Sequence, residues 1–284
     1  MSKKVAIVSD SSASLTEEML KEYNIYTSYL LIIFGNDSYE EFKEITPAKF
    51  VELSSAQAEL PTTSQPILGS TVELYENLLK DGYDEIIHIT ISSGLSGSYQ
   101  SAVNAAEMVD ANKIHVFDSK TVAFPQGALA IKAAKLAKEE KDVTEIISEL
   151  EKMQENNFVN ATVKTLENLK KGGRLSNASA VIGSMLQVKP IIAMSPEGKL
   201  EAISKVRTFK KAIQALIDTA KDADLDESYE IGIIHVLNLE DAATLKDVIA
   251  ELYPNITIHT LPLSLVVSAH VGEGTIAMTW AKTK

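Results

Sequence analysis

Short runs of β-branched residues alternate with amphipathic helical segments over the first half of the chain, and this alternation limits the fold more than any other feature. Strands that alternate with helices pair in parallel through right-handed crossovers, which predicts a doubly wound α/β sheet. The expected strands are residues 5–8, 25–33, 85–91 and 114–117. The expected helices are residues 14–23, a short one from 46, 70–82, 97–108, 124–138 and 143–154.

Several of these helices have recognisable start signals. Ser14 with Glu17, and Ser70 with Glu73, match the capping-box pattern. Thr46 precedes Pro47, and proline is favoured at the first helical position because its missing N–H costs nothing there. Residues 56–66 and 170–173 lack periodicity and are expected to be loops.

The second half has a different pattern, which predicts a second α/β domain. Residues 190–194 and 202–206 flank a Ser-Pro-Glu-Gly turn and predict a hairpin. A strand at 231–236, a helix at 240–252 and a strand at 256–261 follow. The expected domains are residues 1–158 and 159–284, with a cleft between them.

Composition narrows the class of protein. A chain of 284 residues, 45% hydrophobic and 23% charged, is typical of a globular protein with room for two domains. The absence of cysteine excludes disulfides and thiolate ligands. Lys3 and Lys4 are followed by only four apolar residues, and no apolar run reaches about 18 residues. We therefore expect a cytoplasmic protein with no signal peptide and no transmembrane segment.

The charge is negative overall but positive locally. A net charge of −12 argues against a nucleic-acid surface. Residues 164–211 nevertheless hold eight Lys and two Arg against three Glu, a local charge of +7. This stretch is either an accident of loop composition or a docking face. Arg174 and Arg207 are the only arginines, so either they cap helices or their planar forks bind a carboxylate or phosphate.

Three polar segments are candidates for a binding site. Thr62-Thr63-Ser64-Gln65-Pro66 carries four hydrogen-bonding side chains, and Ser92 to Ser98 follows a strand and opens a helix, where backbone N–H groups favour an anion. His270 adds one titratable imidazole. Ligands of doubly wound sheets bind beyond the carboxyl ends of the strands, which directs attention to the loops after Val8, Ile91 and Phe117.

Each segment also has an alternative interpretation. Gly94 to Gly97 lacks the Walker lysine, and Gly272-x-Gly274 lacks the third glycine of a dinucleotide fingerprint. A hydrolase could combine Ser93, His270 and either Asp10 or Asp118, but no Gly-x-Ser-x-Gly elbow is present. The alternative interpretation of Ser92 to Ser98 is a helix cap, and the alternative for His270 is a histidine of the core. The strand-Asp-Ser pattern at Asp10 and Asp118 is most often a helix N-cap. The five histidines show no metal-ligand spacing.

Taken together, these motifs resemble the DegV family, the fatty-acid-binding subunits of bacterial fatty acid kinase. The resemblance covers essentially the whole chain, and its motifs occur at residues 8–11, 63–66, 91–99, 117–119, 171–176, 189–191, 202–207 and 269–272. In this order they are highly specific, although singly only 63–66 and 92–97 would attract attention. Ser9 stands where the family often has Thr, and Phe124-Pro125 where a small polar residue is common.

The resemblance implies two α/β domains with a lipid tunnel that opens at their interface. It implies that Thr63, Ser93 and His270 hold the carboxyl group of a long-chain fatty acid, with Thr62 and Ser96 nearby. A separate ATP-dependent kinase would then phosphorylate the carboxyl group for phospholipid synthesis, with Arg174 and Arg207 at the kinase contact. No metal, no cofactor and no catalytic residue is implied, and contact with a membrane is expected to be transient at most. The alternatives are a Ser/His lipid or acyl-ester hydrolase, and a protein that only transports or senses lipid.

Overall fold

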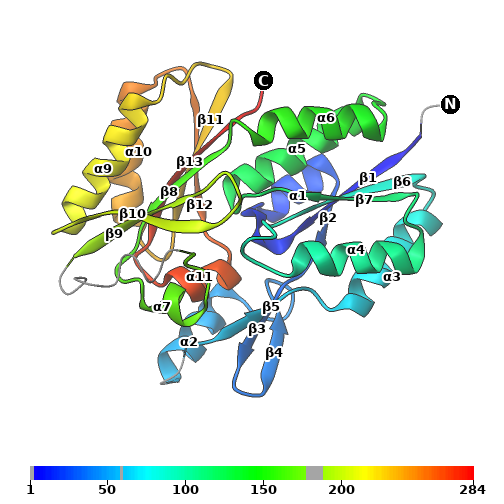
Figure 1. Cartoon of the computed structure of the whole chain (residues 1–284), viewed down its shortest axis with the longest axis horizontal. Helices are drawn as coiled ribbons and strands as arrows, with labels where there is room; N and C mark the ends of the chain where they lie inside the picture. The colour runs from blue at the N-terminus through cyan, green and yellow to red at the C-terminus, as the bar shows by residue number, and fades with distance from the viewer. Residues whose placement is uncertain (1–2, 58–59, 177–187) are drawn as a thin grey trace.

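The first sheet is parallel, as the alternation of strands and helices predicts. The computed structural model describes residues 3–57, 60–176 and 188–284 (Figure 1). In this sheet the strand order is β2-β1-β6-β7. The strands are β1 (Val5–Asp10), β2 (Ile25–Ser28), β6 (Glu85–Thr90) and β7 (Ile114–Asp118). All residues of β1 and β6 are buried, because helices cover both faces of the sheet.

The two faces of this sheet meet different helices. Ala6 and Val8 of β1 pack with α3 (Leu68–Lys80) and α4 (Ser98–Val109). Val5 and Ile7 point the other way, toward α5 (Phe124–Lys138) and α6 (Val143–Gln154). This alternation is the period of two expected for a strand that is buried on both faces.

The second sheet is mixed and has the strand order β10-β9-β8-β13-β11-β12. Its strands are β8 (Phe158–Thr162), β9 (Lys189–Met194), β10 (Leu200–Val206), β11 (Tyr229–His235), β12 (Thr257–Pro262) and β13 (Ile276–Lys282). Helices α9 (Phe209–Asp222) and α10 (Leu239–Leu252) cover its outer face. The predicted boundary between residues 158 and 159 falls at the start of β8 and stays a prediction.

Helix α5 lies between the two sheets. It packs on β1 and β6 on one side and on β11 and β13 on the other, and Figure 1 shows it in green between the two layers. Phe124, at its first turn, packs against Gly232 of β11. A Cβ at residue 232 would lie 2.5 Å from Cγ of Phe124 and 2.6 Å from Oγ1 of Thr279, so only glycine leaves room for this contact.

A small antiparallel sheet, β4-β3-β5, flanks the two large ones. It consists of β3 (Leu31–Phe34), β4 (Asp37–Glu40) and β5 (Thr62–Ser64), with α2 (Pro47–Ala56) beside it. Helix α11 (Leu265–Val271) packs on β3 and β5 and also contacts α7 (Glu167–Lys171). The chain thus returns from its last third to contact residues near its start (Figure 1).

Both predicted capping boxes are wrong. Ser14 adopts a left-handed conformation with φ of 50°, so it cannot serve as the extended N-cap residue. Helix α1 (Glu17–Tyr23) instead begins after Thr16, whose side chain accepts a hydrogen bond from the backbone N–H of Met19. Helix α3 begins at Leu68 rather than Ser70, because the N–H of Thr71 already donates to the carbonyl of Ile67.

Three other expectations need correction. The strand predicted over residues 25–33 is two strands, because β2 pairs with β1 whereas β3 turns away into the small sheet. The loop predicted over 56–66 contains β5, which pairs with β3. The loop predicted over 170–173 begins inside α7, which ends at Lys171.

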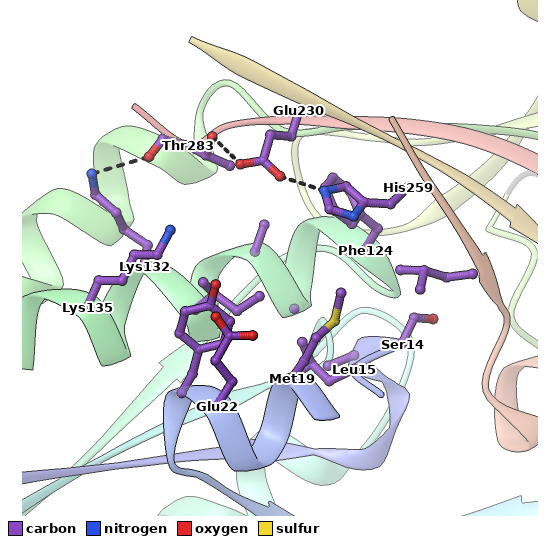
Figure 2. A pocket seen from close by; sticks show the side chains of 16 residues that line it. Ser14, Leu15, Met19, Glu22, Phe124, Lys132, Lys135, Glu230, His259 and Thr283 are labelled. Carbon is purple, nitrogen blue, oxygen red and sulfur yellow. Dashed lines mark hydrogen bonds and ion pairs between the residues drawn. The ribbon is translucent and has the colours of Figure 1, made fainter. Parts of the chain in front are cut away.

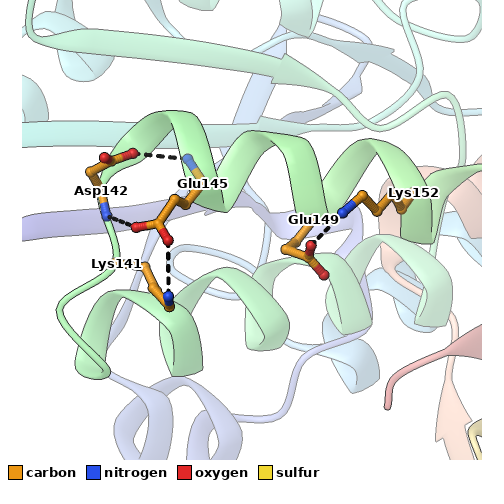
Figure 3. A network of polar contacts seen from close by, with 5 residues as sticks. All are labelled: Lys141, Asp142, Glu145, Glu149 and Lys152. Atoms are coloured by element: carbon orange, nitrogen blue, oxygen red, sulfur yellow. Dashed lines mark hydrogen bonds and ion pairs between the residues drawn. The ribbon is translucent and has the colours of Figure 1, made fainter.

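Helices α5 and α6 lie where the sequence predicts them. The start of α6 has a complete capping box, in which the Asp142 side chain accepts from the N–H of Glu145 and the Glu145 side chain accepts from the N–H of Asp142 (Figure 3). Lys141, just before the helix, forms an ion pair with Glu145, and Lys152 forms one with Glu149 on the exposed face of the helix (Figure 3). Because these signals are local in sequence, they could be recognised without the tertiary structure.

Replacing Gly232 with Ala should destabilise the protein by about 1 to 3 kcal/mol, because the added methyl group overpacks the contact between α5 and β11. Chemical denaturation measures this free energy of unfolding. Gly69→Ala is the control, since no atom lies within 4 Å of a Cβ there, and we expect it to be neutral or slightly stabilising. Equal stability of the two variants would contradict the close packing at Gly232.

Candidate functional site

The loop that leaves β6 is held from both sides by carboxylates at the ends of the neighbouring strands. Asp10, at the end of β1, accepts a hydrogen bond from the N–H of Ile91 at 2.8 Å. Asp118, at the end of β7, accepts from the N–H of Ser93 at 3.0 Å. The strand order places β6 between β1 and β7, so the two Asp-Ser motifs brace one loop rather than serve only as helix caps.

Asp10 is almost completely buried. Its side chain also accepts from Nε2 of Gln126 on α5 at 2.6 Å and from the hydroxyl of Ser12. Burial raises the pKa of this carboxyl group, and the hydrogen bonds from Ser12, Ile91 and Gln126 oppose the rise. These bonds tie the loop after β6 to the helix that lies between the two sheets.

The second sheet closes onto the same loop. The hydroxyl of Ser92 donates to the carbonyl of Gly198 at 2.6 Å, in the turn between β9 and β10. Gly198 has a φ of 74°, and a Cβ there would lie 2.2 Å from Oγ of Ser92. The sequence predicts the turn at residues 195–198, but only the tertiary structure places it on the loop after β6.

An inner cavity of about 120 Å³ lies at this seam between the sheets. Its polar lining includes Thr63, Gln65, Ser96 and His270, and its apolar lining includes Leu30, Ile91, Leu95, Leu169, Leu200, Val266, Val267 and Val271. Oγ1 of Thr63 and Nε2 of His270 form a hydrogen bond of 2.7 Å, in which the tautomer of His270 decides the donor. The cavity therefore has largely apolar walls, a small group of neutral hydrogen-bonding side chains and the cation Arg174.

His270 is held as a neutral imidazole. Burial lowers its pKa to about 4, and the positive charge of Arg174 contributes to the decrease. The imidazole lies close to the backbone of Gly172, where a Cβ would be 2.5 Å from Nδ1. At neutral pH the imidazole of His270 is thus neutral, and Arg174 supplies a positive charge at this cavity.

A buried carboxyl group holds the helix that carries His270. Glu41 has no exposed surface, accepts from the N–H of Val266 at 3.0 Å, and accepts from the hydroxyl of Ser11 at 2.7 Å. Ser264 caps the same helix by accepting from the N–H of Val267. Burial raises the pKa of Glu41 to about 8. Glu41 thereby links the start of α11 to the end of β1.

The structure brings together some of the predicted site residues. Thr63, Ser96, His270 and Arg174 all line the inner cavity. Thr62, the neighbour of Thr63 on β5, lines an adjoining outer cavity instead.

Ser93 and Arg207 lie elsewhere. The exposed hydroxyl of Ser93 donates to Asp118, and Ser93 does not line the inner cavity. Ser96 lines the cavity with Thr63 and His270, and the grouping of Ser93 with these two residues stays a prediction. Arg207 is exposed at the end of β10.

The sequence interpretation missed Glu41 and the bracing role of Asp10 and Asp118. The repeated strand-Asp-Ser motif was the available signal for the two aspartates, since both follow strands of one parallel sheet. Glu41 had no such signal, because its partners Ser11 and Val266 are 30 and 225 residues away.

A second cavity of about 250 Å³ shares no lining residue with the inner cavity (Figure 2). Its polar groups largely pair with one another: His259 with Glu230 at 2.6 Å, Thr283 with Glu230 at 3.0 Å, and Lys132 with the carbonyl of Thr283 at 3.5 Å. Phe124 forms part of its wall and lies against His259. Because these polar groups already have partners, this cavity offers a polar ligand less than the inner one.

The described part of the chain offers neither a membrane-spanning helix nor a metal site. Within residues 3–57, 60–176 and 188–284, no helix is both long and apolar enough to cross a bilayer. Over the same ranges, no group of three or more His, Asp or Glu side chains has an arrangement that could hold a metal ion.

Comparison with known proteins gives consistent matches over the whole chain. A family model described as "Uncharacterised protein, DegV family" matches residues 4–283. Protein DegV of Bacillus subtilis is 37% identical over 278 residues, which cover 97% of this chain and 98% of that protein.

Solved structures of DegV proteins have the same fold as this chain. A fatty acid binding DegV family protein from Streptococcus agalactiae superposes with a TM-score of 0.91 at 31% identity, covering 99% of this chain and 100% of that one. DegV of Bacillus subtilis, described as a fatty acid binding protein, gives a TM-score of 0.88 at 36% identity with the same coverage. The α/β architecture with a parallel first sheet is therefore shared with these proteins.

The raised pKa of Glu41 predicts a pH-dependent stability difference. A carboxyl group whose pKa is higher in the folded state stabilises the fold fully below its unfolded pKa of 4.5, and this contribution is lost as the pH rises toward 8. Glu41→Gln mimics the protonated form. Relative to the wild type, its free energy of unfolding should increase by up to about 1.4 kcal/mol per pH unit between pH 5 and pH 8.

Urea denaturation at several pH values measures this difference. Glu52→Gln, on the exposed face of α2, is the matched control and should show no such trend. A pH-independent difference between Glu41→Gln and the wild type would show that Glu41 does not titrate as its burial implies.

Proposed function

Since the chain belongs to the DegV family, we propose that it binds one long-chain fatty acid, with the carboxyl group in the inner cavity and the hydrocarbon chain in the apolar core. The observation that carries this proposal is the hydrogen bond between Thr63 and His270 in a cavity whose remaining walls are largely apolar. The fatty acid binding described for the two DegV structures supports the same assignment.

The polar residues suit a carboxylate that must remain reactive. Thr63, Ser96 and the neutral His270 can donate hydrogen bonds but carry no charge at pH 7. Uncharged donors orient a carboxylate without a bidentate ion pair. Arg174 also lines the cavity, but its Nε and Nη1 already donate to the carbonyls of Leu95 and Gly172. The carboxyl oxygen therefore keeps its nucleophilic character.

The apolar residues account for affinity. Ile91, Leu95, Leu169, Leu200 and Val271 line the inner cavity and also belong to the core cluster that joins the two sheets. We place the tunnel for the acyl chain along this cluster. Burying about 16 carbons at ~0.8 kcal/mol each corresponds to roughly 12 kcal/mol, so capture of the chain does not depend on the polar head.

We assign the chemical step to a partner, an ATP-dependent fatty acid kinase subunit. A carboxyl oxygen of the bound fatty acid attacks the γ-phosphorus of ATP, and the bond from that phosphorus to the β,γ-bridging oxygen breaks. The products are an acyl phosphate for phospholipid synthesis and ADP. In this proposal Arg174 and the exposed Arg207 contribute to the docking face for the kinase, within the positively charged stretch of residues 164–211.

The hydrolase alternative has little support from the geometry. Ser93 donates to Asp118, and His270 pairs with Thr63, so the described residues do not join a serine to this histidine. Nδ1 of His270 faces the backbone of Gly172, where a triad would have a carboxylate. We therefore propose that the chain binds its ligand and breaks no bond itself.

The ligand is tested by extracting lipid from the purified protein and identifying it by mass spectrometry, which should give a long-chain fatty acid. Thr63→Val should reduce the affinity for a fatty acid about tenfold or more, because a hydrogen bond to a charged group is lost. The affinity for a fatty alcohol of the same length should change much less.

Two further variants make this test specific. Thr244→Val, on the exposed surface of α10, is the control and should leave both affinities unchanged. Gly172→Ala should act like Thr63→Val, because the added methyl group displaces His270. Absence of any fatty acid from the extract, together with no binding of added fatty acid, would refute the proposal.

The docking assignment predicts that Arg207→Ala slows formation of acyl phosphate by a cognate kinase with ATP, while fatty acid affinity stays the same. Transfer of the labelled γ-phosphate of ATP to the bound fatty acid measures the rate. Lys221→Ala, exposed on α9 outside the positively charged stretch, should have no effect. Turnover of an aryl ester by the protein alone would favour the hydrolase instead.

A further inference from the structure

An outer cavity of about 430 Å³ adjoins the inner one. The two share Thr63, Arg174 and His270 as lining residues, and the outer cavity adds Thr62 and Lys171. A group that projects outward from the Thr63–His270 pair therefore enters the outer cavity. This space lies at the open side of the proposed carboxyl site.

The lining of the outer cavity is positively charged in an acidic protein. Among the residues that the structure describes, it includes Lys171 and Arg174 but no Asp or Glu, whereas the chain as a whole has a net charge of −12. Lys171 is exposed at the end of α7 and forms no ion pair with any carboxylate in the described ranges. Its positive charge is thus available to an anion.

Two backbone hydrogen bonds hold the guanidinium of Arg174 in position and occupy only part of its N–H donors. Nε donates to the carbonyl of Leu95 at 3.1 Å, and Nη1 donates to the carbonyl of Gly172 at 2.6 Å. These bonds leave Nη2 with no hydrogen-bond acceptor among the described residues. A guanidinium held in this way loses little conformational freedom when it binds an anion.

The two cavities differ in the anion that they suit. The inner cavity offers neutral donors and the cation Arg174 to a single carboxylate charge, whereas the outer cavity adds Lys171. A phosphoryl group carries about −1.5 to −2 charges and three acceptor oxygens. Two cations next to each other match the second kind of anion better.

We propose that the outer cavity holds the phosphoryl group of an acyl phosphate, with Lys171 and Arg174 as its cationic partners. This inference rests on the fatty acid binding and phosphoryl transfer proposed above. It gives Arg174 a role in binding the product in addition to any contact with a kinase.

The test compares two ligands of equal chain length by calorimetry, hexadecanoic acid and hexadecyl phosphate, the second being a stable mimic of an acyl phosphate. The wild type should bind the phosphate at least as tightly as the acid. Lys171→Ala should weaken binding of hexadecyl phosphate about tenfold or more and leave binding of the acid unchanged, because only the phosphoryl group reaches residue 171. Lys171→Arg should restore most of the loss.

Lys170→Ala removes the same charge one residue earlier on α7 and is the matched control, since Lys170 does not line the outer cavity. It should change neither affinity appreciably. Equal effects of Lys171→Ala on both ligands, or no effect on either, would overturn the inference. If inorganic phosphate binds as tightly as hexadecyl phosphate, with the same dependence on Lys171, the outer cavity would be assigned to a free anion instead of an acyl phosphate.

Outcomes for the wild type separate this inference from the proposed function. If hexadecanoic acid binds but hexadecyl phosphate does not, the outer cavity is not a phosphoryl site, and the fatty acid proposal stands. If neither ligand binds, the fatty acid proposal itself fails.

Discussion

The packing of α5 between the two sheets is the contact on which the rest of the structure depends. Phe124 approaches β11 closely because residue 232 is glycine, and Gln126 two residues later donates to the buried carboxylate of Asp10. One helix therefore sets both the distance between the sheets and the position of the loop after β6. Both cavities that we assign to the ligand lie at the seam that this packing creates.

Two buried acids transmit that arrangement to the proposed binding site. Asp10 holds the loop that carries Leu95 and Ser96, and Glu41 holds the helix that carries His270. Asp10 and Glu41 are distant in the chain, yet each accepts a hydrogen bond from one of two adjacent serines just after β1. Ser12 donates to Asp10, and Ser11 donates to Glu41. Burying a carboxyl group is costly unless it is hydrogen-bonded, so both are placed where backbone N–H groups need an acceptor.

Neutral hydrogen-bonding side chains and positively charged side chains lie next to each other in the proposed site. Thr63, Ser96 and a neutral His270 line the inner cavity, whereas Lys171 lies in the outer cavity and Arg174 contacts both. Arg174 also disfavours protonation of His270. A ligand whose head group changes from a carboxylate to a phosphate would thus move from the neutral donors toward Lys171 and Arg174.

The sequence alone was sufficient for the α/β class, for the parallel first sheet, and for α5 and α6, because hydrophobic period, caps and turn residues act over a few positions. Family motifs also pointed to Thr63, Ser96, His270 and Arg174, which the structure places around one cavity, and their role in binding stays a proposal. The sequence interpretation placed Ser93 rather than Ser96 with Thr63 and His270, and it gave no sign that Ser93 donates to Asp118 from a neighbouring strand. The bracing role of Asp10, the role of Glu41 and the contact between Gly232 and Phe124 were likewise decided only by the tertiary structure, since each joins segments distant in the chain whose approach no local pattern records.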